Sequence, residues 1–190
     1  MQYVRLGMLV LMCACLSGVA RADAEEEKDD EKAEHAVAKE VLAGAKIDLA
    51  KAIETAQQKI AGGKPIYATT AKGSKSLRFD VFLLVGNGSV TEVRIDAASG
   101  KIKKIEENED EDVEDLDDAK KVLAASKITF AQAIATAKGK VEGGKPFEVE
   151  TDLEGGKSLI EVELMVGDKV MIVEIDAVTG EVVEVEEEKE

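Results

Sequence analysis

The residues that could carry chemistry are few. His35 is the only histidine, so neither a pair of histidine metal ligands nor a Ser-His-Asp triad can be assembled. It lies in an acidic segment, where we expect a surface residue. Gly156-Lys157-Ser158 matches the end of a phosphate-binding loop, but the earlier glycine that such a loop requires would fall at Thr151. We therefore interpret this cluster as a turn.

Carboxylates are the remaining candidates. Glu161 and Glu163 lie two positions apart in an alternating segment, so they share one face of a strand. Paired carboxylates can do acid–base chemistry, but on the outer face of a sheet we expect them to be solvated, with ordinary pKa values. The acidic run 106–115 could suggest a calcium loop, yet it lacks the glycine that an EF-hand needs. We expect a solvated, extended linker there.

The composition bounds the class of protein. The 190 residues are 45% hydrophobic, and 25 Lys and Arg against 40 Asp and Glu give a net charge of −15. The hydrophobic fraction is ordinary for a globular chain. The acidity disfavours nucleic acid and anionic membrane surfaces, because phosphate would be repelled. It permits a basic protein partner or loose Ca²⁺ binding, and nothing in the sequence calls for a cofactor.

The N-terminus is typical of an export signal. A basic residue precedes an apolar run over 6–20, and a small-x-small pattern ends at Ala22. We expect a signal peptide cleaved between Ala22 and Asp23, with release to the periplasm or the cell exterior and no stable membrane insertion. Cleavage there would remove both cysteines. Two alternatives stay open, an uncleaved anchor and a lipoprotein attached through Cys15.

The chain is a tandem repeat. Val41-Leu42-Ala43 returns as Val122-Leu123-Ala124, an offset of 122 − 41 = 81, and Gly62-Gly63-Lys64-Pro65 returns as Gly143-Gly144-Lys145-Pro146. A unit of roughly 60 to 70 residues is near the smallest size that folds alone, so the two units could share a sheet. We expect a signal peptide at 1–22, an acidic disordered leader at 23–35, a first domain at 36–106, an acidic linker at 107–117, a second domain at 118–186 and an acidic tail at 187–190.

Each unit is predicted to be a helix packed on a roughly four-stranded antiparallel sheet, which is an α+β class. Apolar residues at helical spacing follow Asp48 and Thr129, both suited to be N-caps, and Thr129 forms a capping box with Gln132. Glycine pairs end the helices, and alternating apolar segments joined by hairpin turns follow. A short leading helix could precede each unit. The first and fourth strands are the candidate edges for pairing with an extended peptide.

Two motifs resemble those of the PepSY domain family. Residues 128–134 read Ile-Thr-x-x-x-Ala-Ile, and residues 173–182 read Val-x-Ile-Asp-Ala-x-Thr-Gly-x-Val. The first unit repeats both motifs, with Asp48 and Ser99 in place of threonine. The resemblance implies an exported, non-catalytic module that restrains or regulates a secreted peptidase, with no catalytic residues to carry over. The alternative is an acidic structural or cation-buffering envelope protein without a peptidase partner.

Overall fold

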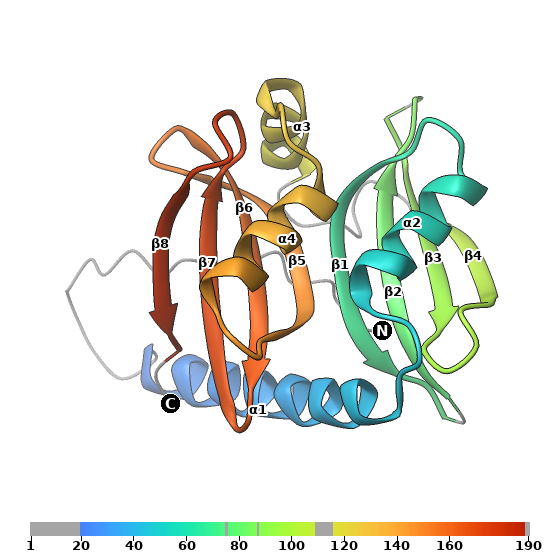
Figure 1. The fold of residues 1–190 in the computed structure, drawn as a ribbon, viewed down its shortest axis with the longest axis vertical. Helices are drawn as coiled ribbons and strands as arrows, with labels where there is room; N and C mark the ends of the chain where they lie inside the picture. The colour runs from blue at the N-terminus through green and yellow to red at the C-terminus, as the bar shows by residue number, and fades with distance from the viewer. Residues whose placement is uncertain (1–19, 75, 87, 109–115, 189–190) are drawn as a thin grey trace.

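The computed structural model describes residues 20–74, 76–86, 88–108 and 116–188. Most of the predicted signal peptide, Cys15 and residues 109–115 of the predicted linker lie outside these ranges. The described residues form four helices and eight strands (Figure 1). In chain order these are α1 (Ala20–Gly44), α2 (Leu49–Lys59), β1 (Lys64–Lys72), β2 (Leu77–Leu84), β3 (Val90–Asp96), β4 (Ile102–Asn108), α3 (Leu116–Ala125), α4 (Phe130–Lys140), β5 (Lys145–Glu154), β6 (Lys157–Val166), β7 (Lys169–Asp176) and β8 (Val182–Glu187).

The two units share one sheet. Its strand order is β4-β3-β2-β1-β5-β6-β7-β8, and every neighbouring pair is antiparallel. The units join where β1 pairs with β5, centred on Ala68 opposite Val149. The prediction that the fourth strands are edges is therefore confirmed. The prediction that the first strands are edges is wrong, because each first strand is the other's partner at the centre of the sheet.

Helices α2 and α4 cover one face of the sheet, as the sequence predicts (Figure 1). The Asp48 side chain accepts a hydrogen bond from the Lys51 backbone N–H, and the predicted capping box of Thr129 and Gln132 is present. Both caps satisfy backbone groups at the start of a helix, which fixes where each helix begins. The buried faces of the helices are Leu49, Ala52, Ile53 and Ala56 in α2, and Phe130, Ala133, Ile134 and Ala137 in α4.

The opposite face of the sheet holds the two leading helices, and each of them packs against strands of both units. Ala119 of α3 packs in one cluster with strand residues of the first unit, whereas Ala38 of α1 packs in one cluster with strand residues of the second. Each unit therefore buries part of its own sheet under the other unit's helix. The strand residues are Ile66, Tyr67, Phe82 and Val90 in the first cluster, and Phe147, Met165 and Val170 in the second.

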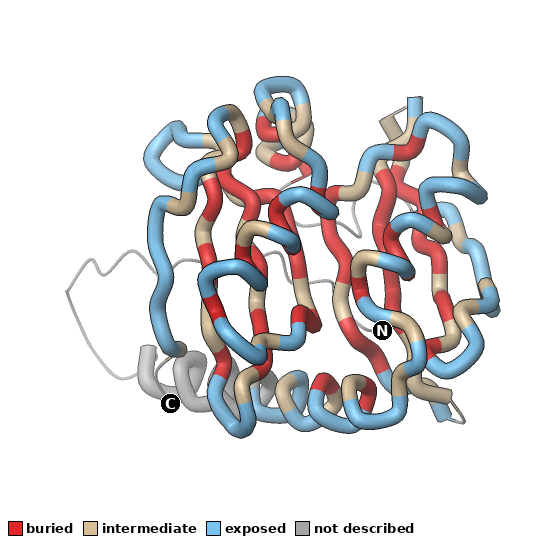
Figure 2. The backbone as a smooth tube through the Cα atoms, in the orientation of Figure 1, coloured by how far each residue is buried: buried red, intermediate tan, exposed pale blue. Residues whose placement is uncertain are grey.

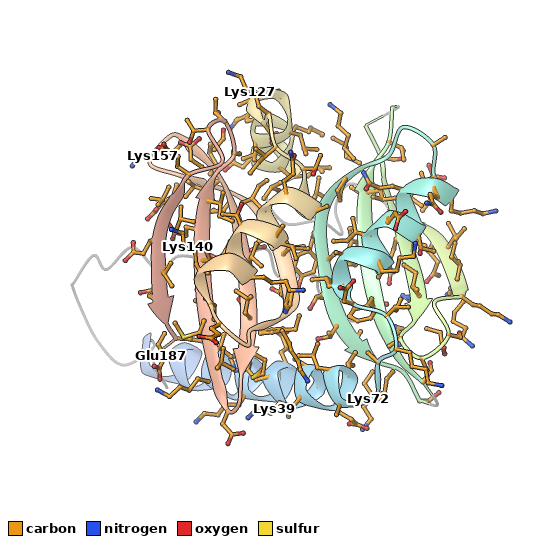
Figure 3. All side chains as sticks on the ribbon, in the orientation of Figure 1. Lys39, Lys72, Lys127, Lys140, Lys157 and Glu187 are labelled. Atoms are coloured by element: carbon orange, nitrogen blue, oxygen red, sulfur yellow. The ribbon has the colours of Figure 1, made fainter. Side chains whose placement is uncertain are left out.

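Helix α1 runs through the segment 23–35, where the sequence predicts a disordered leader. That prediction is wrong in the structure: the segment is helical, and it is rich in Ala, Glu and Lys, which favour helices. Beyond it, Lys39 lies 3.1 Å from Asp168 and Glu40 lies 2.6 Å from Lys72 (Figure 3). Among the described residues, no helix has both the length and the apolar character that crossing a membrane requires.

Burial follows this architecture. Figure 2 shows buried residues along the inner strands and exposed residues along the two outermost strands. The largest fully buried side chains include Phe79, Leu83, Ile95, Leu164 and Ile175, all from the strands. The inner strands are mainly apolar on the face toward α2 and α4, and most of their charged side chains lie on the face toward α1 and α3.

Candidate functional site: an acidic face on the second unit

Four glutamates form a row across the second half of the sheet. Glu150 of β5 lies opposite Glu161 of β6, which lies opposite Glu174 of β7, which lies opposite Glu184 of β8. Residues that are directly opposite in antiparallel strands share a face and have neighbouring Cβ atoms. We call these four residues the acidic row. Like charges in such positions destabilise a sheet, so the row costs folding free energy.

The acidic row lies on the side of the sheet away from α4. The alternating residues between its members, such as Val149, Val162 and Val173, belong to the core beneath the two covering helices. Burial decreases along the row: Glu150 is 4% exposed, Glu161 and Glu174 are half-buried, and Glu184 is exposed.

Three further glutamates extend the row. Glu148 lies opposite Glu163, and Glu186 lies opposite Ile172 on the next strand pair. They belong to the same face, because residues two apart on a strand point the same way. We call the acidic row together with Glu148, Glu163 and Glu186 the acidic face.

Burial and mutual repulsion change the ionisation of this face. The pKa of Glu161 is raised to about 8, first by burial and then by the surrounding carboxylates of Asp152, Glu148 and Glu174. Burial also raises the pKa of Glu163 well above its usual value, with Glu148 and Glu161 adding to the effect. The prediction that Glu161 and Glu163 are solvated carboxylates with ordinary pKa values is therefore wrong. Glu161 faces Glu150 and Glu174, and Glu163 faces Glu148, so repulsion between carboxylates adds to burial in favouring the protonated form.

Glu148 lies at the junction between the two units. Its carboxylate accepts a hydrogen bond from the Thr69 hydroxyl at 2.6 Å, across the β1–β5 pairing. Burial raises its pKa to about 7, although the hydrogen bonds from Thr69 and Tyr67 oppose the shift. Tyr67 is itself buried, and burial together with Glu148 raises the pKa of its phenol well above the usual value.

The equivalent face of the first unit balances its charges. At the positions of the acidic row it carries Thr69, Asp80, Arg94 and Lys104, offsets of 81, 81, 80 and 80. Arg94 donates to Glu92 at 2.5 and 2.9 Å and lies 3.1 Å from Glu106. Arg78 donates to Asp80 at 2.7 Å. The first unit therefore places Arg and Lys among its carboxylates at these positions, whereas every equivalent position in the second unit is Glu.

His35 lies close to the acidic face rather than on an open surface. Its Nε2 is 3.2 Å from a carboxylate oxygen of Glu188, and its ring packs edge-on against Phe147 at 5.9 Å between centroids. The prediction of a simple surface histidine is therefore wrong. The helix that carries His35 packs on the second unit, which brings the residue to the end of β8.

The Asp-Ala-x-Ser/Thr-Gly segments form turns that tie the sheet to the covering helices. The Asp176 carboxylate accepts hydrogen bonds from the N–H groups of Val178 and Thr179, both at 2.8 Å, and these bonds lower its pKa. The carbonyl of Ala177 accepts from the Lys127 N–H at 2.8 Å, just before α4. In the first unit Asp96 accepts from the N–H and the hydroxyl of Ser99, and the Ala97 carbonyl accepts from the Lys46 N–H at 2.9 Å. The motif therefore has a structural role.

Gly180 closes the second of these turns with a φ of 76°, a conformation that favours glycine. A Cβ atom there would approach the Ile128 side chain to 3.2 Å. Gly100 has the same left-handed conformation, with a φ of 69°.

The other residues singled out in the sequence form no site. Gly156-Lys157-Ser158 lies at the β5–β6 hairpin, where Gly156 has a φ of 82°, so the turn interpretation is confirmed. Ala22 and Asp23 lie within α1, and cleavage between them stays a prediction. Of the acidic run 106–115, only 106–108 is described, as the end of β4. Among the described residues, no three His, Cys, Asp or Glu side chains are arranged to hold a metal ion, so the structure gives no support to Ca²⁺ binding.

Sequence reasoning missed three members of the acidic row, Glu150, Glu174 and Glu184. A signal was available in the comparison of the two repeats. Positions that are Thr, Asp, Arg and Lys in the first unit are all Glu in the second, and that change of charge is readable without a structure. What was not readable is the register that aligns them.

Comparison with known proteins identifies the family of the two repeats. A family model described as "Peptidase propeptide and YPEB domain", PepSY, matches residues 46–106 and 127–186. A comparison with curated proteins finds no match. Among solved structures, a candidate lipoprotein from Clostridium difficile 630 has 19% identity and a TM-score of 0.43, covering 72% of this chain and 90% of its own. The YpeB C-terminal domain of Bacillus megaterium has 15% identity and a TM-score of 0.29, covering 77% of this chain and 67% of its own.

Both TM-scores are below 0.5, so neither structure bears on function. The family match is different in kind, because it falls on both repeats and covers more than half of the sequence. It includes the two Asp-Ala-x-Ser/Thr-Gly turns and both covering helices. The chain belongs to the PepSY family, and its single sheet is built from two copies of that domain.

Proposed function

We propose that this chain is an exported, non-catalytic protein that binds a secreted peptidase and restrains it through the acidic face. The observation that carries the proposal is the acidic row, four opposed glutamates at positions where the first unit has a mixed set. The family description, which names peptidase propeptides, supports the class of partner.

The acidic row lowers the folding stability of the chain. Opposed carboxylates destabilise an antiparallel sheet, and residues that break the local rules of stability are concentrated at functional sites. A partner that presents Lys or Arg would neutralise the row and recover that free energy on binding. The field of the clustered carboxylates would also steer a basic surface toward this face, most strongly at low salt.

The test measures peptide hydrolysis by peptidases exported from the same cell, with and without the purified chain. We expect inhibition that is stronger at roughly 20 mM than at roughly 200 mM salt, because screening weakens charge attraction. The double variant Glu174→Lys, Glu184→Lys should weaken inhibition at least about tenfold, since two like-charge contacts to a basic partner replace two attractive ones.

Glu54→Lys is the matched control, because Glu54 is an exposed residue of α2 on the other side of the sheet. It makes the same change of charge per residue, half that of the double variant, and should leave inhibition as it is. Hydrolysis by the chain alone, lost on mutation of one carboxylate, would overturn the non-catalytic part. If no peptidase is inhibited and the chain instead binds Ca²⁺ weakly and in proportion to its charge, the result would favour the structural or cation-buffering alternative.

The export part of the proposal has its own measurement. The chain recovered outside the cytoplasm should begin at Asp23, which would shorten α1 by its first three residues, Ala20 to Ala22. A mature chain that begins at a lipid-modified Cys15 would establish an anchored protein instead.

A further inference from the structure

The two edges of the sheet are equivalent strands that have diverged. Edge strands expose unpaired backbone groups and can add another strand, so proteins usually protect them. Among the described residues, three large hydrophobic side chains are exposed: Ile105 on β4, at 40%, and Val183 and Val185 on β8, at 46% and 42%. In Figure 1, β4 forms one end of the sheet and β8 the other.

The charges on β4 are self-complementary about Ile105. The strand reads Lys103-Lys104-Ile105-Glu106-Glu107. If two copies of this strand run antiparallel with Ile105 opposite itself, Lys104 of each copy lies opposite Glu106 of the other. The same register sets Lys103 opposite Glu107 of the other copy. Opposite charges in directly opposed positions stabilise an antiparallel pair.

β8 does not have this property. The equivalent strand carries Glu184 and Glu186 on either side of Val185. The same antiparallel self-pairing would oppose Glu184 to Glu186 twice, and both contacts would be repulsive. Pairing β4 with β8 of another copy would give two attractive contacts, Lys104 to Glu186 and Lys103 to Glu187, and one repulsive contact, Glu106 to Glu184. The β4–β4 pairing is therefore the best matched of the three.

The charges of β4 already have partners within the chain. Glu106 contacts Arg94 at 3.1 Å and is paired with Lys104, Lys103 lies 3.3 Å from Asp96, and the Ser89 hydroxyl donates to Glu107 at 3.0 Å. Both lysines are about half exposed, and exposed pairs of this kind hold their side chains weakly. A carboxylate also has acceptor sites for more than one donor. The strand can therefore take up contacts to a second copy without losing those to β3.

We propose that β4 is a homodimer edge, at which two copies of this chain pair antiparallel about Ile105 and continue their sheets into one. The contact is isologous, so it closes on itself and leaves β8 as the outer edge on both sides. It brings the two Ile105 side chains together on the face of α2 and places the Lys104–Glu106 pairs on the opposite face. The inference does not depend on the proposed peptidase partner, because the acidic face lies in the other half of each sheet.

The test is sedimentation velocity of the full purified chain over a range of concentrations, at low and high salt. We expect a concentration-dependent monomer–dimer equilibrium that weakens as salt is raised. Lys104→Glu should raise the dimer dissociation constant roughly tenfold or more, because both Lys–Glu contacts become Glu–Glu contacts. Glu106→Lys should do the same. The double variant Lys104→Glu, Glu106→Lys exchanges the two charges and should restore dimerisation.

Glu184→Lys is the matched control on β8 and should leave the dimer unchanged. Circular dichroism establishes that each variant is folded, and Ile105→Lys gives a second way to weaken the edge if Glu106→Lys perturbs Arg94. A chain that stays monomeric up to roughly millimolar concentration, a range in which weak specific contacts are populated, overturns the proposal. So does a double variant that fails to recover, or an open-ended series of oligomers that Glu184→Lys alters, which would indicate β4–β8 pairing.

Discussion

Glu161 is the residue at which the acidic face departs furthest from an ordinary surface. Its pKa of about 8 in the folded chain lies above that of an unperturbed Glu, so the folded state binds the extra proton between these two values. A carboxylate whose pKa rises on folding contributes stability that is fully present below its unfolded pKa. That contribution is lost as the pH rises through the folded pKa. The free energy of unfolding should therefore decrease between about pH 5 and pH 8.

Replacing Glu161 with Gln should remove much of this pH dependence. The amide cannot ionise, so at pH 8 the variant should be more stable than the parent chain by about 1–2 kcal/mol, after allowance for solvent screening of a half-buried group. Near pH 5 the two should differ little. Urea unfolding at several pH values provides the measurement, with Glu54→Gln on α2 as the control. If the free energy of unfolding depended on pH equally in the parent and in Glu161→Gln, the pKa of this carboxyl would not be raised by folding.

Asp176 provides a second test at a single residue. Asp176→Ala leaves the N–H groups of Val178 and Thr179 without their acceptor, and each bond is to a charged group. We expect the free energy of unfolding to decrease at pH 7. Because these bonds lower the Asp176 pKa, the difference from the parent should shrink as the pH falls through that pKa. Glu142→Ala, an exposed acid outside the turn, should have almost no effect.

Helices α1 and α3 are the elements whose placement decides how the units depend on one another. Ala38 of α1 is fully buried in a cluster with strand residues of the second unit. Ala119 of α3 is buried in the corresponding cluster of the first. Each helix therefore stabilises strands that are distant from it in the sequence.

The variant Ala38→Asp should test the packing of α1 on the second unit. A buried carboxylate without a partner costs about 3 kcal/mol or more. We expect the helix to detach and amide hydrogen exchange to accelerate in β5 and β6, although the mutation lies in the first unit. Exchange that accelerates in β2 and β3 alone would contradict this packing. Ala43→Asp, on an exposed position of the same helix, is the control.

The elements predicted from the sequence were largely those with local signals. The N-cap residues Asp48 and Thr129 indicate where the covering helices begin, and the alternation of apolar and polar residues indicates the strands. The partner of β1 carried no such signal, because pairing with β5 joins residues about 80 positions apart. The same holds for the packing of each leading helix on the other unit and for the register of the acidic row, both of which depend on contacts between the units. The segment 23–35 departs from the prediction because its Ala, Glu and Lys residues favour a helix despite its acidity.

The whole molecule should behave as one cooperative unit. Its sheet is continuous through the β1–β5 pairing, the Thr151 hydroxyl donates to the Ile66 carbonyl across that junction at 3.2 Å, and the leading helices bind the units to each other. Two independent domains would instead unfold in two steps. The structure therefore has two repeats but a single folding unit.

Calorimetry should accordingly show one transition, with the calorimetric and van't Hoff enthalpies equal. A fragment that contains only 118–190 should be much less stable than the same residues in the full chain, because Phe147, Met165 and Val170 would lose their cover from α1. Two resolved transitions in the full chain, or a fragment as stable as the parent, would contradict this expectation.

Because each leading helix packs on strands of the other unit, some of its contacts can form only late in chain synthesis. A polypeptide emerges from its N-terminus, so α1 is complete long before β5 and β6, the strands on which Ala38 packs, have been made. During that interval α1 lacks the contacts of Ala38 with the second unit, and the first unit lacks the cover that α3 will bring. The nascent first unit therefore exposes two apolar surfaces until the second unit has been made. It needs a chaperone or rapid completion of the chain, which a pair of self-contained domains would not need.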